Sequence, residues 1–190
     1  MLLKRYSKSG EKMRILDLGC GKNKYKSENP SDVVIGIDFS EDSDADVIHD
    51  LTKFPYPLKD SEFDMIICSH VIEHLPNTLH VLEELWRIAK NGATVKIWTP
   101  YFSCPGAYTD VTHIKYFTYN SFNFTKYAPS SSSKIAAKFR NIKRRLLFNK
   151  YQKFTGFEWL MNTFPEVYEN TFLCYLFPAG IVYFELEVIK

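Results

Sequence analysis

Short apolar runs follow one another through the first half of the chain, and each is ended by a glycine, an acid or another polar residue. They cover 13–18, 33–38, 45–51, 63–68 and 93–98. Runs of this length that are rich in Val and Ile are typical of buried strands. The run 63–68 is apolar almost throughout, as expected for a parallel strand that is covered on both faces.

Helical spacing connects the last two runs. A helix is predicted over 77–90, with its end at Asn91-Gly92, a typical C-terminal signal. Its apolar stripe consists of Leu79, Leu82, Leu85, Trp86 and Ala89. The segment 22–32 lacks such spacing and contains an Asn29-Pro30 step, so the first crossover helix is predicted to be short or absent. Strands that alternate with helical connections indicate a doubly wound α/β sheet.

Beyond residue 125 the pattern changes twice. A flexible hinge is predicted at 129–133. The fold then needs a sixth strand, yet the apolar residues recur at helical spacing, at Ile135, Phe139, Ile142 and Leu146. We therefore expect a helical or mixed start that enters a strand near 142–148, followed by a helix at 158–164.

The C-terminal segment 181–189 has an apolar residue at every second position. Its apolar face consists of Val182, Phe184, Leu186 and Val188. Period-two alternation predicts a closing strand, which we place in an antiparallel pair.

Composition indicates an ordinary globular protein. A length of 190 residues fits one domain, and 45% hydrophobic with 24% charged residues is typical of soluble folds. The four cysteines lie far apart without a Cys-x-x-Cys pair, which favours a reduced, cytoplasmic protein. The N-terminus has no signal-peptide core, and the longest apolar stretch, 172–184, is too short to span a bilayer.

Charge is distributed in blocks although the net charge is only +2. The block from Lys134 to Lys153 carries eight basic residues and no acid, whereas 38–50 carries six acids and no Lys or Arg. A basic block is either a solvated face or a contact surface for nucleic-acid phosphates.

The strand 13–18 runs directly into Gly19-Cys20-Gly21. Glycines allow unusual backbone angles and let the backbone approach a ligand that a side chain would repel. Such a turn opens a ligand crevice at the carboxyl edge of an α/β sheet. Asp38 ends the second strand 21 residues after Asp17, the position from which an acid binds ribose hydroxyls in nucleotide-binding folds.

These residues resemble the class I S-adenosylmethionine-dependent methyltransferases. The run 17–21 is similar to their first motif, and 69–75, Ser-His-Val-Ile-Glu-His-Leu, strongly resembles their fourth. NAD enzymes prefer Gly-x-Gly-x-x-Gly, and this chain has Lys24 at the last position. The third glycine of the methyltransferase motif is also absent, and Asn23 stands in its place.

The resemblance covers about 13–125 and implies an architecture. We expect a Rossmann-like, mostly parallel, seven-stranded sheet with an antiparallel closing strand, in three α/β/α layers. One domain would span 1–190, with a core at 13–100, a lid and substrate region at about 101–170, and the closing strand at about 180–190.

The resemblance also implies that the cofactor is S-adenosyl-L-methionine. It implies that Asp38 binds ribose, that Asp50 receives the adenine amino group while Leu51 packs on the ring, and that Ser69 lines the sulfonium region. The remaining residues assigned to the cofactor are those of the glycine turn and the neighbour of Asp38, namely Asp17, Gly19, Cys20, Gly21 and Phe39.

Candidate catalytic groups are histidines, because histidine titrates near neutral pH. His70, His74 and His113 are expected to face the acceptor, with Asp110 as a further candidate base. The segment containing Asp110 and His113 resembles an Asp-x-Thr-His signature in small members of the family, which implies a loop over the active site. Much of the catalysis of methyl transfer comes from holding the nucleophile in line.

A metal site is a second interpretation of the same residues. If a helix begins near His70, then His70, Glu73 and His74 share one face and, with His113, suit a divalent ion. The set resembles the metal-binding block of small-RNA 2′-O-methyltransferases and of O-methyltransferases of ubiquinone synthesis, which carry Glu in place of His70. The alternative is that Glu73 and His74 only shape the pocket floor.

We therefore expect a methyltransferase that acts on an O or N atom of a small-molecule acceptor. The sequence leaves three alternatives open: an RNA methyltransferase that uses the basic block and a metal, a non-catalytic partner protein that binds S-adenosylmethionine, and a Rossmann-type enzyme that uses NAD or a nucleotide sugar.

Overall fold

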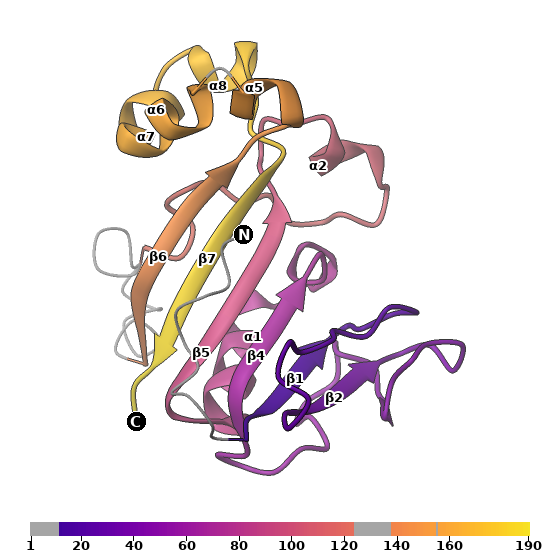
Figure 1. The fold of residues 1–190 in the computed structure, drawn as a ribbon. Helices are drawn as coiled ribbons and strands as arrows, with labels where there is room; N and C mark the ends of the chain where they lie inside the picture. The colour runs from indigo at the N-terminus through magenta and orange to yellow at the C-terminus, as the bar shows by residue number, and fades with distance from the viewer. Residues whose placement is uncertain (1–11, 124–137, 155) are drawn as a thin grey trace.

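The computed structural model describes residues 12–123, 138–154 and 156–190. Its strands form one sheet of seven strands in the order β3-β2-β1-β4-β5-β7-β6 (Figure 1). The strands are β1 (Arg14–Leu18), β2 (Val33–Asp38), β3 (Val47–Ile48), β4 (Phe63–Ser69), β5 (Ala89–Pro100), β6 (Phe139–Leu147) and β7 (Ile181–Val188).

Strand directions confirm the predicted fold class. The neighbouring strands β3, β2, β1, β4 and β5 are parallel to one another. β7 runs antiparallel to β5 and to β6. The alternating residues of the predicted closing strand all face the core, because Val182, Phe184 and Leu186 are fully buried.

Helices cover the sheet unevenly. They are the 3₁₀ turn η1 (Ile72–His74), α1 (Thr78–Ile88), α2 (Gly106–Thr109), α5 (Lys150–Phe154), α6 (Phe157–Thr163), α7 (Pro165–Glu169) and α8 (Leu173–Leu176). In Figure 1, α1 lies behind β4 and β5, and α5 to α8 gather where β6 ends and β7 begins. The helix predicted at 158–164 corresponds to α6. Within the described ranges, no helix is long and apolar enough to cross a bilayer.

The face of the sheet opposite α1 carries no helix in the described part of the chain. The segment between β1 and β2 is a loop there, as its sequence predicts, so the described residues supply one of the two expected helical layers. Ile15, Met65 and Ile67 form a small buried cluster on this face, against which Tyr25 and Trp98 pack.

The helix α1 is shorter than predicted at its C-terminal end. Asn77 caps its start by accepting a hydrogen bond from the backbone N of His80 at 3.2 Å. The helix ends at Ile88, because the chain pairs with β4 from Ala89 onward and leaves Gly92, at φ 77°, inside an irregular part of β5. The buried stripe is Val81, Leu82, Leu85 and Ile88, whereas Leu79 is exposed.

The expected helical start before 142 is wrong for the residues from Phe139 onward, which already belong to strand β6. Ile135 lies outside the described residues. The register between β6 and β7 shifts between Asn141 and Lys143, which adds a residue to one strand. The shift places both Phe139 and Leu146 in the core and leaves Ile142 exposed. The apolar residues of this bulged strand are therefore spaced as they would be in a helix. The predicted hinge 129–133 lies outside the described residues, and β3 is limited to Val47–Ile48.

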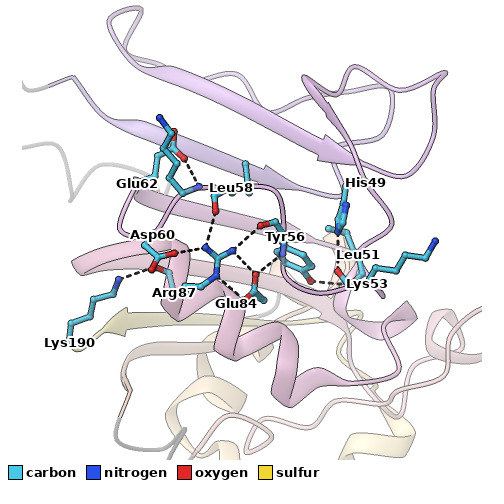
Figure 2. Close-up of polar contacts among 11 residues, drawn as sticks. His49, Leu51, Lys53, Tyr56, Leu58, Asp60, Glu62, Glu84, Arg87 and Lys190 are labelled. Carbon is cyan, nitrogen blue, oxygen red and sulfur yellow. Dashed lines mark hydrogen bonds and ion pairs between the residues drawn. The ribbon is translucent and has the colours of Figure 1, made fainter.

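The segment between β3 and β4 is held to α1 by Arg87 (Figure 2). Its guanidinium donates to the carbonyl oxygens of Tyr56 and Leu58, each at 2.9 Å. The guanidinium also donates to Glu84 Oε2 at 2.7 Å, and that oxygen accepts a second hydrogen bond from the backbone N of Tyr56 at 2.7 Å. The network fixes the ring of Tyr56, which is 2% exposed, against the core.

Replacing Arg87 by methionine is expected to lower the free energy of unfolding by about 1–3 kcal/mol, because the carbonyls and Glu84 lose their donor. Urea denaturation measures the change. K59M removes an exposed lysine from the same segment and should change the value by less than about 0.5 kcal/mol. Equal effects of the two substitutions would show that the network contributes nothing to stability.

Candidate active site

The glycine turn after β1 is pressed against the segment after β4. Gly19 has φ 67° and donates its backbone N to the carbonyl of Ile37 at 2.8 Å. A Cβ at Gly19 would lie 2.3 Å from Cγ2 of Val71. Only glycine therefore fits at this position, and the contact brings the first and fourth motifs together.

Asp38 joins this turn to the end of β2. Its Oδ2 accepts a hydrogen bond from the backbone N of Gly21 at 2.9 Å, and its Oδ1 accepts one from Ser40 N at 3.0 Å. A carboxylate oxygen has a second lone pair, so both oxygens keep acceptor capacity. Asp38 is thus a fixed acid at the carboxyl edge of the sheet.

A pocket of about 490 Å³ opens beside the turn. Five of the predicted residues line it: Asp17, Gly19, Cys20, Ser69 and His70. Asp17 is 5% exposed, and its Oδ2 accepts a hydrogen bond from Tyr25 N at 2.7 Å. Burial raises the pKa of Asp17, and burial also raises that of Cys20 to about 11.

Sequence reasoning missed the other residues of the pocket wall, which are Asn23, Tyr25, Ile67, Lys96, Trp98 and Ile181. Lys96 gave a local signal, because it is a charged residue inside an apolar strand. Ile181 gave none, because β7 reaches the pocket only through its pairing with β5.

The remaining cofactor candidates lie outside this pocket lining. Asp50 Oδ1 accepts hydrogen bonds from the side chain and the backbone N of Thr52, at 2.7 and 3.0 Å, and these bonds lower the pKa of Asp50. It is therefore also a turn cap. Leu51 is 6% exposed and belongs to the main core, whereas Phe39 is 76% exposed.

The segment after β4 does not start a helix at His70, which was the condition on which the metal interpretation placed His70, Glu73 and His74 on one face. His70 has φ 55°, and its backbone N still donates to the carbonyl of Trp98 at 2.9 Å. The chain then turns sharply so that Val71 packs on Gly19, and only the short η1 follows. Nevertheless, His70 Nδ1 lies 3.3 Å from Glu73 Oε1.

The loop that contains His113 lies against this segment. The backbone N atoms of Ile114 and Lys115 donate to the carbonyl of Glu73 at 3.0 and 3.1 Å. The rings of His74 and His113 meet edge to face, with centroids 4.7 Å apart. Two of the three predicted catalytic histidines are therefore neighbours.

Hydrogen bonding determines which ring nitrogen of each neutral histidine is free. The Thr112 hydroxyl donates a hydrogen bond to Asp110 Oδ1 at 2.7 Å. Because its one proton is used there, the Thr112 hydroxyl oxygen accepts the hydrogen bond from His74 Nδ1 at 2.9 Å. His113 Nδ1 faces the carbonyl of Ala107 at 3.1 Å and must donate as well. In both neutral rings Nε2 keeps a lone pair, suited to a base or a metal ligand.

Glu73 is the acid nearest to these rings. Its side chain is 1% exposed, and its Oε2 accepts a hydrogen bond from Thr99 Oγ1 at 3.1 Å. Its buried Oε1 has no hydrogen-bond partner in the described structure. The side-chain atoms of Glu73, His74 and His113 that could bind a metal lie within 4.8 Å of one another. His70, the fourth residue of the predicted metal set, is not part of this group.

The described part of the basic block is largely engaged within the fold. Arg140 pairs with Glu187, and Arg145 pairs with Glu158 at 2.8 Å. Arg144 donates to Asn120 Oδ1 at 2.7 Å. Side chains held in this way are poorly placed to contact a series of phosphates, which weakens the nucleic-acid alternative.

Residues 16–97, which contain both motifs, match the methyltransferase domain family. Over this stretch the chain is similar to the class I S-adenosylmethionine-dependent methyltransferases. A probable S-adenosylmethionine-dependent methyltransferase of Mycolicibacterium smegmatis is 30% identical over 100 residues, which are 45% of this chain and 37% of that protein. The chain thus spans little more than a third of this curated relative.

Solved structures share the fold of this chain. An S-adenosylmethionine-dependent methyltransferase from Archaeoglobus fulgidus has a TM-score of 0.59 at 19% identity, covering 93% of this chain and 86% of its own. The [4+2]-cyclase SpnF has the same TM-score, 0.59, at 14% identity, covering 94% of this chain and 75% of its own. At these identities the similarity establishes the fold alone.

Two glycine substitutions separate steric contact from backbone strain. G21A is expected to cost about 1–2 kcal/mol of stability, because Gly21 has φ 53° but no atom lies within 4 Å of the place that an added Cβ would take. G19A should cost about 1–3 kcal/mol more, because its Cβ also meets Val71. Urea denaturation compares them, and V71A should partly rescue G19A. Equal losses, or no rescue, would contradict the contact.

Proposed function

We propose that the chain is an S-adenosylmethionine-dependent methyltransferase acting on a small-molecule acceptor. The observation that carries the proposal is the pocket, whose wall combines Asp17 and Gly19 of the first motif with Ser69 and His70 of the fourth. The family match covers both motifs. A bound cofactor would supply a methyl group on a sulfonium, already activated for attack by an O or N atom.

The residues of the chain would hold the cofactor along the carboxyl edge of the sheet. Asp17 and the glycine turn lie at the amino-acid end, and Asp38 is the fixed acid for ribose hydroxyls. Asp50, Leu51 and Phe39 remain the candidates for adenine. The exposed ring of Phe39 offers a stacking surface that the buried Leu51 does not.

The histidines would serve the acceptor. An O or N nucleophile loses a proton during or after attack, and a free Nε2 accepts it. His74 is the better-oriented base, because its Nδ1 donates a hydrogen bond to the Thr112 hydroxyl, which is itself held by Asp110. His70 lines the pocket and so lies closer to the transferred group.

Calorimetric titration tests the proposal. S-adenosylhomocysteine is expected to bind with micromolar affinity, and NAD is expected not to bind. D38N should weaken binding roughly 10-fold or more, since a charged acceptor of the ribose is lost, while the fold stays intact. D42N, in an exposed acid of the same segment, should bind as the wild type does. An unchanged affinity of D38N would refute the ribose assignment.

A divalent metal is a second candidate for the histidine cluster. The grouping of Glu73, His74 and His113 favours it. Glu73 Oε1 is buried and makes no hydrogen bond in the described structure, although His70 Nδ1 lies 3.3 Å away, so this oxygen has acceptor capacity for a cation. An ion there would bring acceptor oxygens close to the pocket, whereas without it Glu73 and His74 only shape the segment that follows His70, a residue of the pocket wall.

Manganese titration followed by electron paramagnetic resonance distinguishes these cases. The metal candidate predicts one tightly bound Mn²⁺ per chain and at least about a 10-fold weaker site in H113A. H49A, remote from the cluster, is the control. Wild type and H113A that bind Mn²⁺ alike would remove this candidate, and the histidines would then act as bases.

A further inference from the structure

One row of side chains lies on the face of the sheet opposite α1 and passes through the pocket. In strand register, Asp17 of β1 lies beside Ile67 of β4, and Ile67 lies beside Lys96 of β5. Register partners of a sheet share a face, and adjacent strands are about 4.8 Å apart. The pocket wall therefore carries a carboxylate and an ammonium side chain on either side of one apolar residue.

Lys96 forms no close ion pair among the described residues. It is 8% exposed and lines the pocket, yet its ammonium makes no hydrogen bond there. Glu185, its register partner on β7, accepts a hydrogen bond from the Tyr183 hydroxyl at 2.8 Å instead. Burial lowers the pKa of Lys96, and the charge of Glu185 offsets this only in part. A buried ammonium that makes no direct ion pair is costly, and an anionic ligand would lower that cost.

Asp17 complements Lys96 across the pocket. Only its Oδ2 is occupied by a protein hydrogen bond in the described structure, the one from Tyr25 N. Its Oδ1 is left to accept from a ligand. A molecule that satisfies both side chains must carry a cation and an anion a few ångströms apart, which is the charge pattern of an α-amino acid.

We propose that Lys96 binds the α-carboxylate of the cofactor's amino-acid end while Asp17 binds its α-ammonium. This inference rests on the proposed function, and it assigns to β5 a binding residue outside both motifs. Ile67 and Trp98 would flank the apolar stem of the amino acid. The pair selects the complete zwitterion over adenosine derivatives that lack it.

The test compares two ligands by calorimetry. S-adenosylhomocysteine carries the amino-acid end, and 5′-methylthioadenosine lacks it. K96M is expected to weaken binding of the first roughly 10- to 100-fold and to leave the second within about twofold. K59M removes an exposed lysine from the segment between β3 and β4 and should bind both ligands as the wild type does. K96R should retain most of the affinity for S-adenosylhomocysteine.

Each other outcome counts against the inference in a distinguishable way. Unchanged binding of S-adenosylhomocysteine to K96M would refute the carboxylate contact and leave the proposed function standing. Equal losses for both ligands would show that Lys96 only shapes the pocket. A wild type that binds neither ligand would overturn the proposed function together with this inference.

Discussion

The contact between Gly19 and Val71 is the constraint on which the site depends. It exists because Gly19 has no Cβ and adopts a left-handed backbone, so the turn after β1 can approach the chain leaving β4. The same contact forces the sharp turn at His70. As a result, Asp17, Ser69 and His70 line one pocket although more than fifty residues separate Asp17 from Ser69.

Around this contact, loops that are held by hydrogen bonds form much of the described structure beside the sheet. Tyr25 from the β1–β2 loop holds the Asp17 carboxylate, and the loop with His113 binds the carbonyl of Glu73. Arg87 fastens the segment between β3 and β4 to α1 (Figure 2). Hydrogen bonds that involve the backbone thus give these loops a defined shape with little regular structure.

Fold and site carry separate information about function. A cyclase and a methyltransferase resemble this structure equally well, so the topology alone does not choose the reaction. The proposed reaction rests on chemistry at the carboxyl edge: the fixed acid Asp38, a pocket built from both motifs, and two neighbouring histidines whose Nδ1 atoms are hydrogen-bonded within the described structure. The pairing of Asp17 with Lys96 would add selection for an amino-acid group.

The sequence by itself determined features that depend on near neighbours along the chain. The parallel strands, the missing crossover helix, the glycine turn, Asp38 and the closing strand all follow from periodicity and spacing over a few residues. Tertiary structure decided the rest. A bulge turned apparent helical spacing into β6, the contact with Gly19 bent the chain at His70, and pairing across β4, β5 and β7 brought Ile67, Lys96 and Ile181 to Asp17. These outcomes depend on contacts between distant segments, which local patterns do not encode.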